Sequence, residues 1–219
     1  MHNVKRVRYA VTMAAAGLVL SGTAITAVAA DSSSATAPTA TAATGTHSPG
    51  VAAAGRSYTY LTFKKNSGNP SNSRLSLVYV NMNNPDHPHS YTVNSWRAGS
   101  GNGSKDTCAR NRGWLPNGEY AVKAFYDHHN GGSRGVNGVS WLLSNHKCHS
   151  GTWRTDLFIH GEMRPNGTQG PRTGGDSPYR WDGNGDYKSN GCIKLKPSDI
   201  RELKGYRSGY PKPTRLFVS

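Results

Sequence analysis

A cysteine near the C-terminal end of the chain has the surroundings that covalent catalysis requires. Cys192 follows Ser189, Asn190 and Gly191, and a short apolar run begins at Ile193. Small, turn-forming residues leave room for a carbonyl group to reach the sulfur, and they leave backbone N–H groups free to face a developing oxyanion. A free thiol has a pKa of about 8.5, so it needs a base or a cationic neighbour to react at neutral pH.

His160 is the candidate base. It ends the apolar run 157–159 and precedes Gly161, which predicts an imidazole at the end of a strand, on a rigid part of the fold. Each residue also has an ordinary structural explanation. Cys192 suits a disulfide or a buried small apolar side chain, and His160 suits a hydrogen-bonded core histidine. The two residues alone leave these alternatives open.

The chain divides into three parts by composition. Residues 1–30 carry basic residues, then an Ala-rich apolar run, then small residues, which predicts a secretory signal peptide. The alternative is an uncleaved membrane anchor; after cleavage we expect no stable membrane insertion. Residues 31–55 form an Ala/Ser/Thr/Pro-rich stretch that predicts a disordered linker. Residues 56–219 are long enough to bury a core and form the expected catalytic domain.

Charge and cysteine content point to the cell envelope. The formal net charge is +14, and removal of Lys5, Arg6 and Arg8 with the signal leaves +11. A basic exported protein suits anionic cell-wall polymers. No helix-turn-helix or Arg-rich recognition helix is evident, so we expect no nucleic-acid partner. Three cysteines in an oxidising compartment leave one thiol over after a pair has formed.

The residue patterns predict a mainly β domain with one helix. Alternating apolar residues and turn signals predict strands at 73–82, 89–99, 118–126, 139–144, 154–161 and 215–219. In 118–126, Tyr120, Val122 and Ala124 are expected on the face opposite to Phe125. The helix is expected at 196–206, directly after Cys192, with Ser198 as its N-cap and Gly205 as its stop.

The segments "FIHGE" and "SNGCIKL" resemble the signature of the L,D-transpeptidase catalytic domain, the YkuD-type family. In that signature a His-Gly follows a strand, and a Ser-x-Gly-Cys-Ile-Arg segment comes later. "WLPNGEYAVKAF" is similar to a second family segment, through Pro116, Gly118 and Tyr120. The final "LKGYRSGYPKPTRLFVS" is similar to the family's closing helix, turn and strand. The resemblance covers residues 75–218.

The resemblance implies a fold, an activity and a set of roles. The fold would be a YkuD-like β-sandwich or barrel of short strands, with one helix after the catalytic cysteine. The activity would be L,D-transpeptidation, which needs no cofactor: Cys192 forms an acyl-enzyme with a peptidoglycan stem tetrapeptide, His160 is the base, and an amine of another stem peptide completes a 3→3 cross-link. Backbone N–H groups at Gly191 and Cys192 would hold the oxyanion.

The resemblance also assigns supporting roles. Ser189 and Lys194 would orient the substrate or the loop, and Gly161 belongs to the same matched signature. If Cys192 must stay free for this chemistry, Cys108 and Cys148 become the expected disulfide pair.

The chain departs from the family pattern in three places. Lys194 stands where Arg is usual, and Leu115 where Thr is usual. Lys cannot make the two-point contact with a carboxylate that Arg makes. The stretch 161–188 is longer and richer in glycine than usual, which suggests a lid or a specificity loop.

Other functions and two metal sites were weighed as alternatives. Hydrolysis of the acyl-enzyme would give an L,D-carboxypeptidase or endopeptidase, and loss of catalysis would give a basic cell-wall-binding protein. A secreted toxin that cuts another cell's wall is a further alternative. Zinc ligands are conceivable in "NHKCH" (146–149) and calcium ligands in "DGNGDY" (182–187), but neither completes the usual ligand spacing, so no metal is expected.

Overall fold

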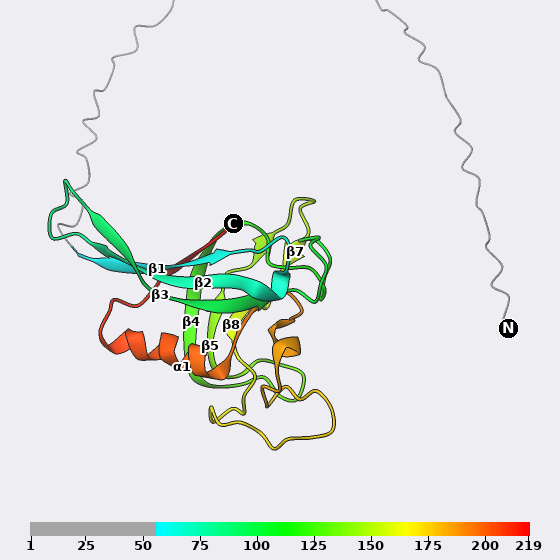
Figure 1. Cartoon of the computed structure of the whole chain (residues 1–219). Helices are drawn as coiled ribbons and strands as arrows, with labels where there is room; N and C mark the ends of the chain where they lie inside the picture. Colours follow the sequence, from blue (N-terminus) through cyan, green and yellow to red (C-terminus); the bar gives the residue numbers. More distant parts are fainter. Residues whose placement is uncertain (1–55) are drawn as a thin grey trace, which may run out of the picture. The chain divides into compact units, whose positions relative to one another are not determined.

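The computed structural model describes residues 56–219, which form ten strands, one α-helix and three short 3-10 turns (Figure 1). The predicted signal peptide 1–30 and linker 31–55 lie outside the described residues. Among residues 56–219, no helix combines the length and the apolar character needed to cross a bilayer.

Eight of the strands close into a barrel, in the order β1-β10-β4-β5-β8-β9-β3-β2. These strands are β1 Tyr58–Lys64, β2 Ser73–Asn81, β3 His89–Ser100, β4 Gly118–Asn130, β5 Asn137–Leu143, β8 Phe158–His160, β9 Ile193–Leu195 and β10 Arg215–Val218. Neighbouring strands are antiparallel except for the pairs β1–β10 and β8–β9, which are parallel. The predicted mainly β class is therefore confirmed, and closure leaves the barrel without an unpaired edge.

Two further strands, β6 His146–Lys147 and β7 Trp153–Arg154, form a small antiparallel sheet of their own. Three 3-10 turns lie at Pro70–Asn72, Asn184–Tyr187 and Tyr206–Ser208. The small sheet matters for the site, because β7 ends four residues before β8 begins.

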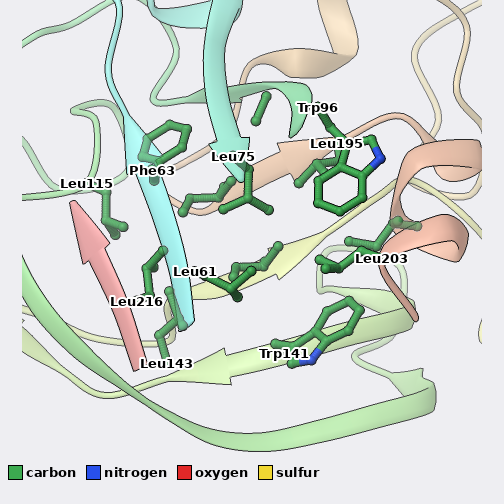
Figure 2. Packing of buried hydrophobic residues seen from close by; sticks show 14 of the residues in the cluster. Leu61, Phe63, Leu75, Trp96, Leu115, Trp141, Leu143, Leu195, Leu203 and Leu216 are labelled. Atoms are coloured by element: carbon green, nitrogen blue, oxygen red, sulfur yellow. The ribbon is translucent and has the colours of Figure 1, made fainter. Parts of the chain in front are cut away.

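The core fills the interior of the barrel. Leu61 on β1 lies opposite Leu77 on β2 and Leu216 on β10, and all three side chains are buried. Figure 2 shows Leu61 and Leu216 packed with the other core residues Phe63, Leu75, Trp96, Leu115, Trp141, Leu143, Leu195 and Leu203. Burial of a side chain of this size contributes about 1.5–3 kcal/mol, and a slip of one residue would turn it outward, so the core fixes the register of the strands.

The helix α1, Pro197–Gly205, packs its apolar side against the barrel (Figure 1). Its buried residues Ile200 and Leu203 join the core, and the indole N–H of Trp96 on β3 donates a 2.9 Å hydrogen bond to Glu202 Oε2. Because α1 begins two residues after β9, this packing also fixes the strand that follows Cys192.

The predicted helix boundaries need correction. Lys196 is the N-cap, and Pro197 takes the first helical position, which suits its fixed φ. Ser198 does not cap the helix, because its hydroxyl donates to Asp199 Oδ1 at 2.9 Å. The α-helix does end at Gly205, as predicted, but Gly205 itself has helical dihedral angles and the chain continues directly into the 3-10 turn Tyr206–Ser208.

Two strand predictions are also corrected, and some strands were not predicted. Register shifts in β4 between Val122 and Ala124 bring Phe125 to the core face, where it lies opposite Trp141 with the ring centroids 5.0 Å apart. The predicted strand 154–161 is broken at Asp156, whose φ is +55°, so only Phe158–His160 joins the barrel. The strand β1 was missed, and so was the short strand β6.

Candidate active site

The parallel pair β8–β9 brings the histidine and the cysteine together. Ile159 lies opposite Ile193, and both are fully buried in the core. His160 lies opposite Lys194. Side chains alternate along a strand, so Cys192, two residues before Lys194, lies on the same side as His160 and away from the core. The usual spacings of strands put the two Cα atoms about 8 Å apart.

A cavity of about 850 Å³ lies over this face, and both Cys192 and His160 line it. Its other walls come from the β4–β5 turn at 131–136, from β7 and from the stretch 161–188. The cavity is large enough for several residues of a peptide.

The Cys192 thiol is free and has two backbone neighbours. The N–H of Phe158 donates to Sγ at 3.4 Å, and Sγ lies 3.5 Å from the carbonyl oxygen of Asp156. Burial raises the pKa of Cys192 to about 11, against the opposing effects of the Phe158 N–H and of the charges on Lys194 and Arg154. The thiol is therefore protonated at neutral pH.

The His160 imidazole is held in one tautomer. Its Nδ1 lies 3.0 Å from the carbonyl oxygen of Gly161, which can only accept, so Nδ1 carries the proton and Nε2 has the free lone pair. Burial, assisted by the charge on Lys194, lowers the pKa of His160 to about 3. The imidazole is thus neutral, with Nε2 unprotonated. Gly161 serves the site through this backbone carbonyl.

Ser189 orients the loop that carries the cysteine. Its hydroxyl donates to the carbonyl of Cys192 at 2.6 Å and accepts from the N–H groups of Gly191 at 3.1 Å and Gly101 at 3.0 Å. The predicted role of Ser189 in orienting the loop fits these contacts. The predicted oxyanion role of Gly191 does not fit this geometry, because its N–H is already bonded to Ser189. The oxyanion role of the Cys192 N–H stays a prediction.

Lys194 holds the stretch 161–188 to the barrel. Its ammonium pairs with Glu162 Oε1, and each of the two residues is only 7 % exposed. The second carboxylate oxygen, Glu162 Oε2, is buried and has no hydrogen-bond partner among the described residues. One carboxylate oxygen from each of Glu162, Asp176 and Asp186 lies within 4.8 Å of the other two. Burial raises the pKa of Glu162 to about 7, although Lys194 acts in the opposite direction.

Part of the stretch 161–188 projects from the barrel as a loop (Figure 1). The base of this loop, here called the neck, is held together by hydrogen bonds. At the neck, the N–H of Gly170 donates to Tyr179 O, and the N–H of Trp181 donates to Gln169 Oε1, both at 2.8 Å. Asp176 and Pro178, near the tip, line the cavity. This placement is what a specificity loop requires, and that role stays a prediction.

No family model matches the chain, and no curated protein matches it. The features that bear on function are therefore those of the site itself. They are a free thiol, a neutral imidazole with an unprotonated nitrogen, and a cavity that both of them line.

The other cysteines form the disulfide that was predicted. Cys108 and Cys148 are bonded, with their Cα atoms 5.3 Å apart. This bond removes Cys148 from the conceivable zinc site, and the ring of His146 stacks on Tyr120 at 4.5 Å instead.

The conceivable calcium loop is occupied by protein contacts. Asp182 pairs with Arg180 at 2.9 Å, and Asn184 accepts from Arg97 at 2.7 Å. Asp186 accepts from the N–H groups at Asp182 and Gly183 and so stabilises its own turn. These polar groups of 182–187 therefore bond to the protein itself.

The sequence did not predict where Leu115, Glu162 and Arg154 lie relative to the site. Leu115, which replaces the usual Thr, is buried in the core and does not line the cavity. Glu162 and Arg154 were missed as site residues. Glu162 directly follows the His-Gly pair, which is a usable signal. Arg154 belongs to no motif, and only the fold reveals that it lies beside Cys192.

Proposed function

We propose that the chain is an exported cysteine L,D-transpeptidase of the YkuD type, which forms 3→3 cross-links between peptidoglycan stem peptides. The observation that carries the proposal is the β8–β9 pairing, because it sets His160 and the free Cys192 on one face under a shared cavity. The signature around both residues and the helix after the cysteine support it. The basic character of the chain suits an anionic cell wall.

Acylation starts from the neutral pair. Cys192 Sγ attacks the carbonyl carbon between the third and fourth residues of the stem, and His160 Nε2 accepts the thiol proton as the carbonyl electrons move to oxygen. Because burial disfavours a separate thiolate and imidazolium, attack and proton transfer proceed together. Collapse of the tetrahedral intermediate breaks the C–N bond, and the imidazolium returns the proton to the departing amine of D-alanine.

The acyl-enzyme is then resolved by a second nucleophile. An amine of another stem attacks the thioester carbonyl, His160 Nε2 takes the amine proton, the C–S bond breaks, and the proton passes to the Cys192 sulfur. Water in place of the amine would release a tripeptide instead. The cavity walls at 131–136 and 161–188 therefore decide between cross-linking and hydrolysis, because they determine whether a stem amine or only water reaches the thioester.

Product analysis tests the proposal. The exported chain, as wild type and as Cys192→Ala, is incubated with a disaccharide tetrapeptide, and the products are identified by mass spectrometry. We expect wild type to form a dimer with loss of one D-alanine and Cys192→Ala to form none. A tripeptide as the sole wild-type product would identify an L,D-carboxypeptidase. Turnover by Cys192→Ala would overturn the mechanism, and an inert wild type would favour a non-catalytic wall-binding protein.

A further inference from the structure

Arg154 is a buried cation beside Cys192 that the proposed reaction does not yet use. It ends β7, is only 4 % exposed, and lines the same cavity as the thiol. None of the four ion pairs found among residues 56–219 includes it. A buried guanidinium without a carboxylate partner keeps its full positive charge, which acts on whatever lies next to it.

Backbone carbonyls from two loops hold the guanidinium. Nη1 donates to Thr107 O and, at 3.4 Å, to Trp114 O. Nη2 donates to Gly113 O at 3.2 Å and to Asn190 O at 3.3 Å. Asn190 belongs to the cysteine loop, and the other three acceptors lie between β3 and β4. Arg154 therefore joins the cysteine loop to a segment far from it in sequence.

The glycine before the cysteine makes room for this contact. A Cβ on Gly191 would lie 2.0 Å from Arg154 Nη2, and the φ of Gly191 is +120°, which favours glycine. A glycine at position 191 thus leaves space for the Arg154 guanidinium to lie against the cysteine loop. Because the Gly191 N–H is bonded to Ser189, this clearance is the role of the glycine that the structure supports.

The Cys108–Cys148 disulfide links the two segments that position Arg154. Cys108 directly follows Thr107, whose carbonyl accepts from Arg154. Its partner Cys148 directly follows β6, and in the β6–β7 pair His146 lies opposite Arg154. The disulfide therefore ties the acceptor loop to the small sheet that carries the donor.

We propose that Arg154 is a positioning residue that stabilises negative charge on the Cys192 sulfur and fixes its loop, and that the Cys108–Cys148 disulfide keeps Arg154 in place. The consequence for turnover rests on the proposed function. The effect on the thiol does not, since it requires no peptide substrate.

Alkylation of Cys192 by iodoacetamide across pH 7–11 tests the proposal, because Cys192 is the one free thiol of the chain. We expect Arg154→Met to slow alkylation about tenfold at pH 9 and to displace the rising part of the pH–rate profile upward by about one pH unit, since one pH unit is tenfold in thiolate population. Arg154→Lys keeps the positive charge but cannot bond all four backbone carbonyls. We expect its alkylation rate to be about threefold lower than that of wild type. Arg112→Met removes an exposed charge from the same acceptor loop and should match wild type.

The control outcomes keep the two proposals separate. An Arg154→Met protein with the wild-type pH profile would overturn the role of Arg154 even if the chain cross-links stem peptides. A tenfold loss of alkylation without any cross-linking by wild type would support Arg154 and refute the proposed function. If Arg154→Met does not fold, the double variant Cys108→Ser/Cys148→Ser carries the test. It retains Arg154 but releases its acceptor loop, so we expect alkylation at least threefold slower, and an unchanged rate overturns the proposal.

Discussion

The buried Glu162 carboxyl predicts an unusual dependence of stability on pH. Its Oε2 has no partner among the described residues and is shielded from water, so the protonated form is favoured in the folded protein. Burial accordingly raises the pKa of Glu162 from its ordinary 4.5 to about 7. A raised pKa in the folded state means that the folded protein binds the proton more tightly than the unfolded chain does.

The sign and size of the effect follow from this difference. The contribution of Glu162 to the free energy of unfolding is fully present below pH 4.5 and is lost as pH rises to about 7. Each pKa unit corresponds to about 1.4 kcal/mol, so the loss reaches about 3 kcal/mol. The side chains of Glu162 and Lys194 are each only 9 % exposed, so solvent screening reduces this free energy little.

Urea unfolding at pH 4.5–8 measures the effect as a difference between wild type and Glu162→Gln. Gln imitates the protonated carboxyl, so the two proteins should be nearly equal at pH 4.5, and the variant should become more stable than wild type by about 3 kcal/mol at neutral pH. Glu119→Gln, in an exposed pair with Arg215, serves as the control and should show no such trend. A wild type that gains stability over Glu162→Gln as pH rises would refute the reasoning, because it would mean that Lys194 keeps the carboxyl ionised.

Two further predictions concern the frame of the site. Replacement of both Cys108 and Cys148 by Ser opens a closed loop with a sequence separation of 40, which should lower the free energy of unfolding by about 4 kcal/mol, measured in urea against wild type; a loss under 1 kcal/mol would contradict it. Asn137 is buried and bonds to Gly132 O, Gly135 O and the Gly131 N–H, so Asn137→Ala should cost about 1–3 kcal/mol; hydrogen exchange at 131–136 should accelerate, and unchanged exchange would count against this role.

The strand β2 was predicted correctly from a long apolar alternation. The alternation in 73–82 predicts β2, and Leu75 and Leu77 do lie in the core. The face of Phe125 could not be predicted, because a register shift depends on the partner strand and leaves no mark in the local pattern. Asp156, at a positive φ, likewise ends a strand inside an otherwise suitable run.

The site was predictable where neighbours in sequence act together. Ser189, Gly191 and Cys192 form a local turn, and His160 uses the carbonyl of the next residue, so short motifs contain their contacts. Arg154 could not be found in this way, because its four acceptors lie 36 to 47 residues away along the chain. Nothing in its own segment distinguishes it from a surface arginine.

The length of the stretch between His160 and Cys192 follows from the topology. Parallel strands cannot be joined by a tight turn and need a crossover of a dozen or more residues. Since β8 and β9 are parallel neighbours, a long connection is the condition for placing the base and the thiol on one face. The ion pair of Glu162 with Lys194 then holds the start of that connection against β9, the strand to which the connection leads. A shortened connection that kept the neck contacts of Gly170 with Tyr179 should therefore leave Cys192 alkylation unchanged while altering which acceptor is used.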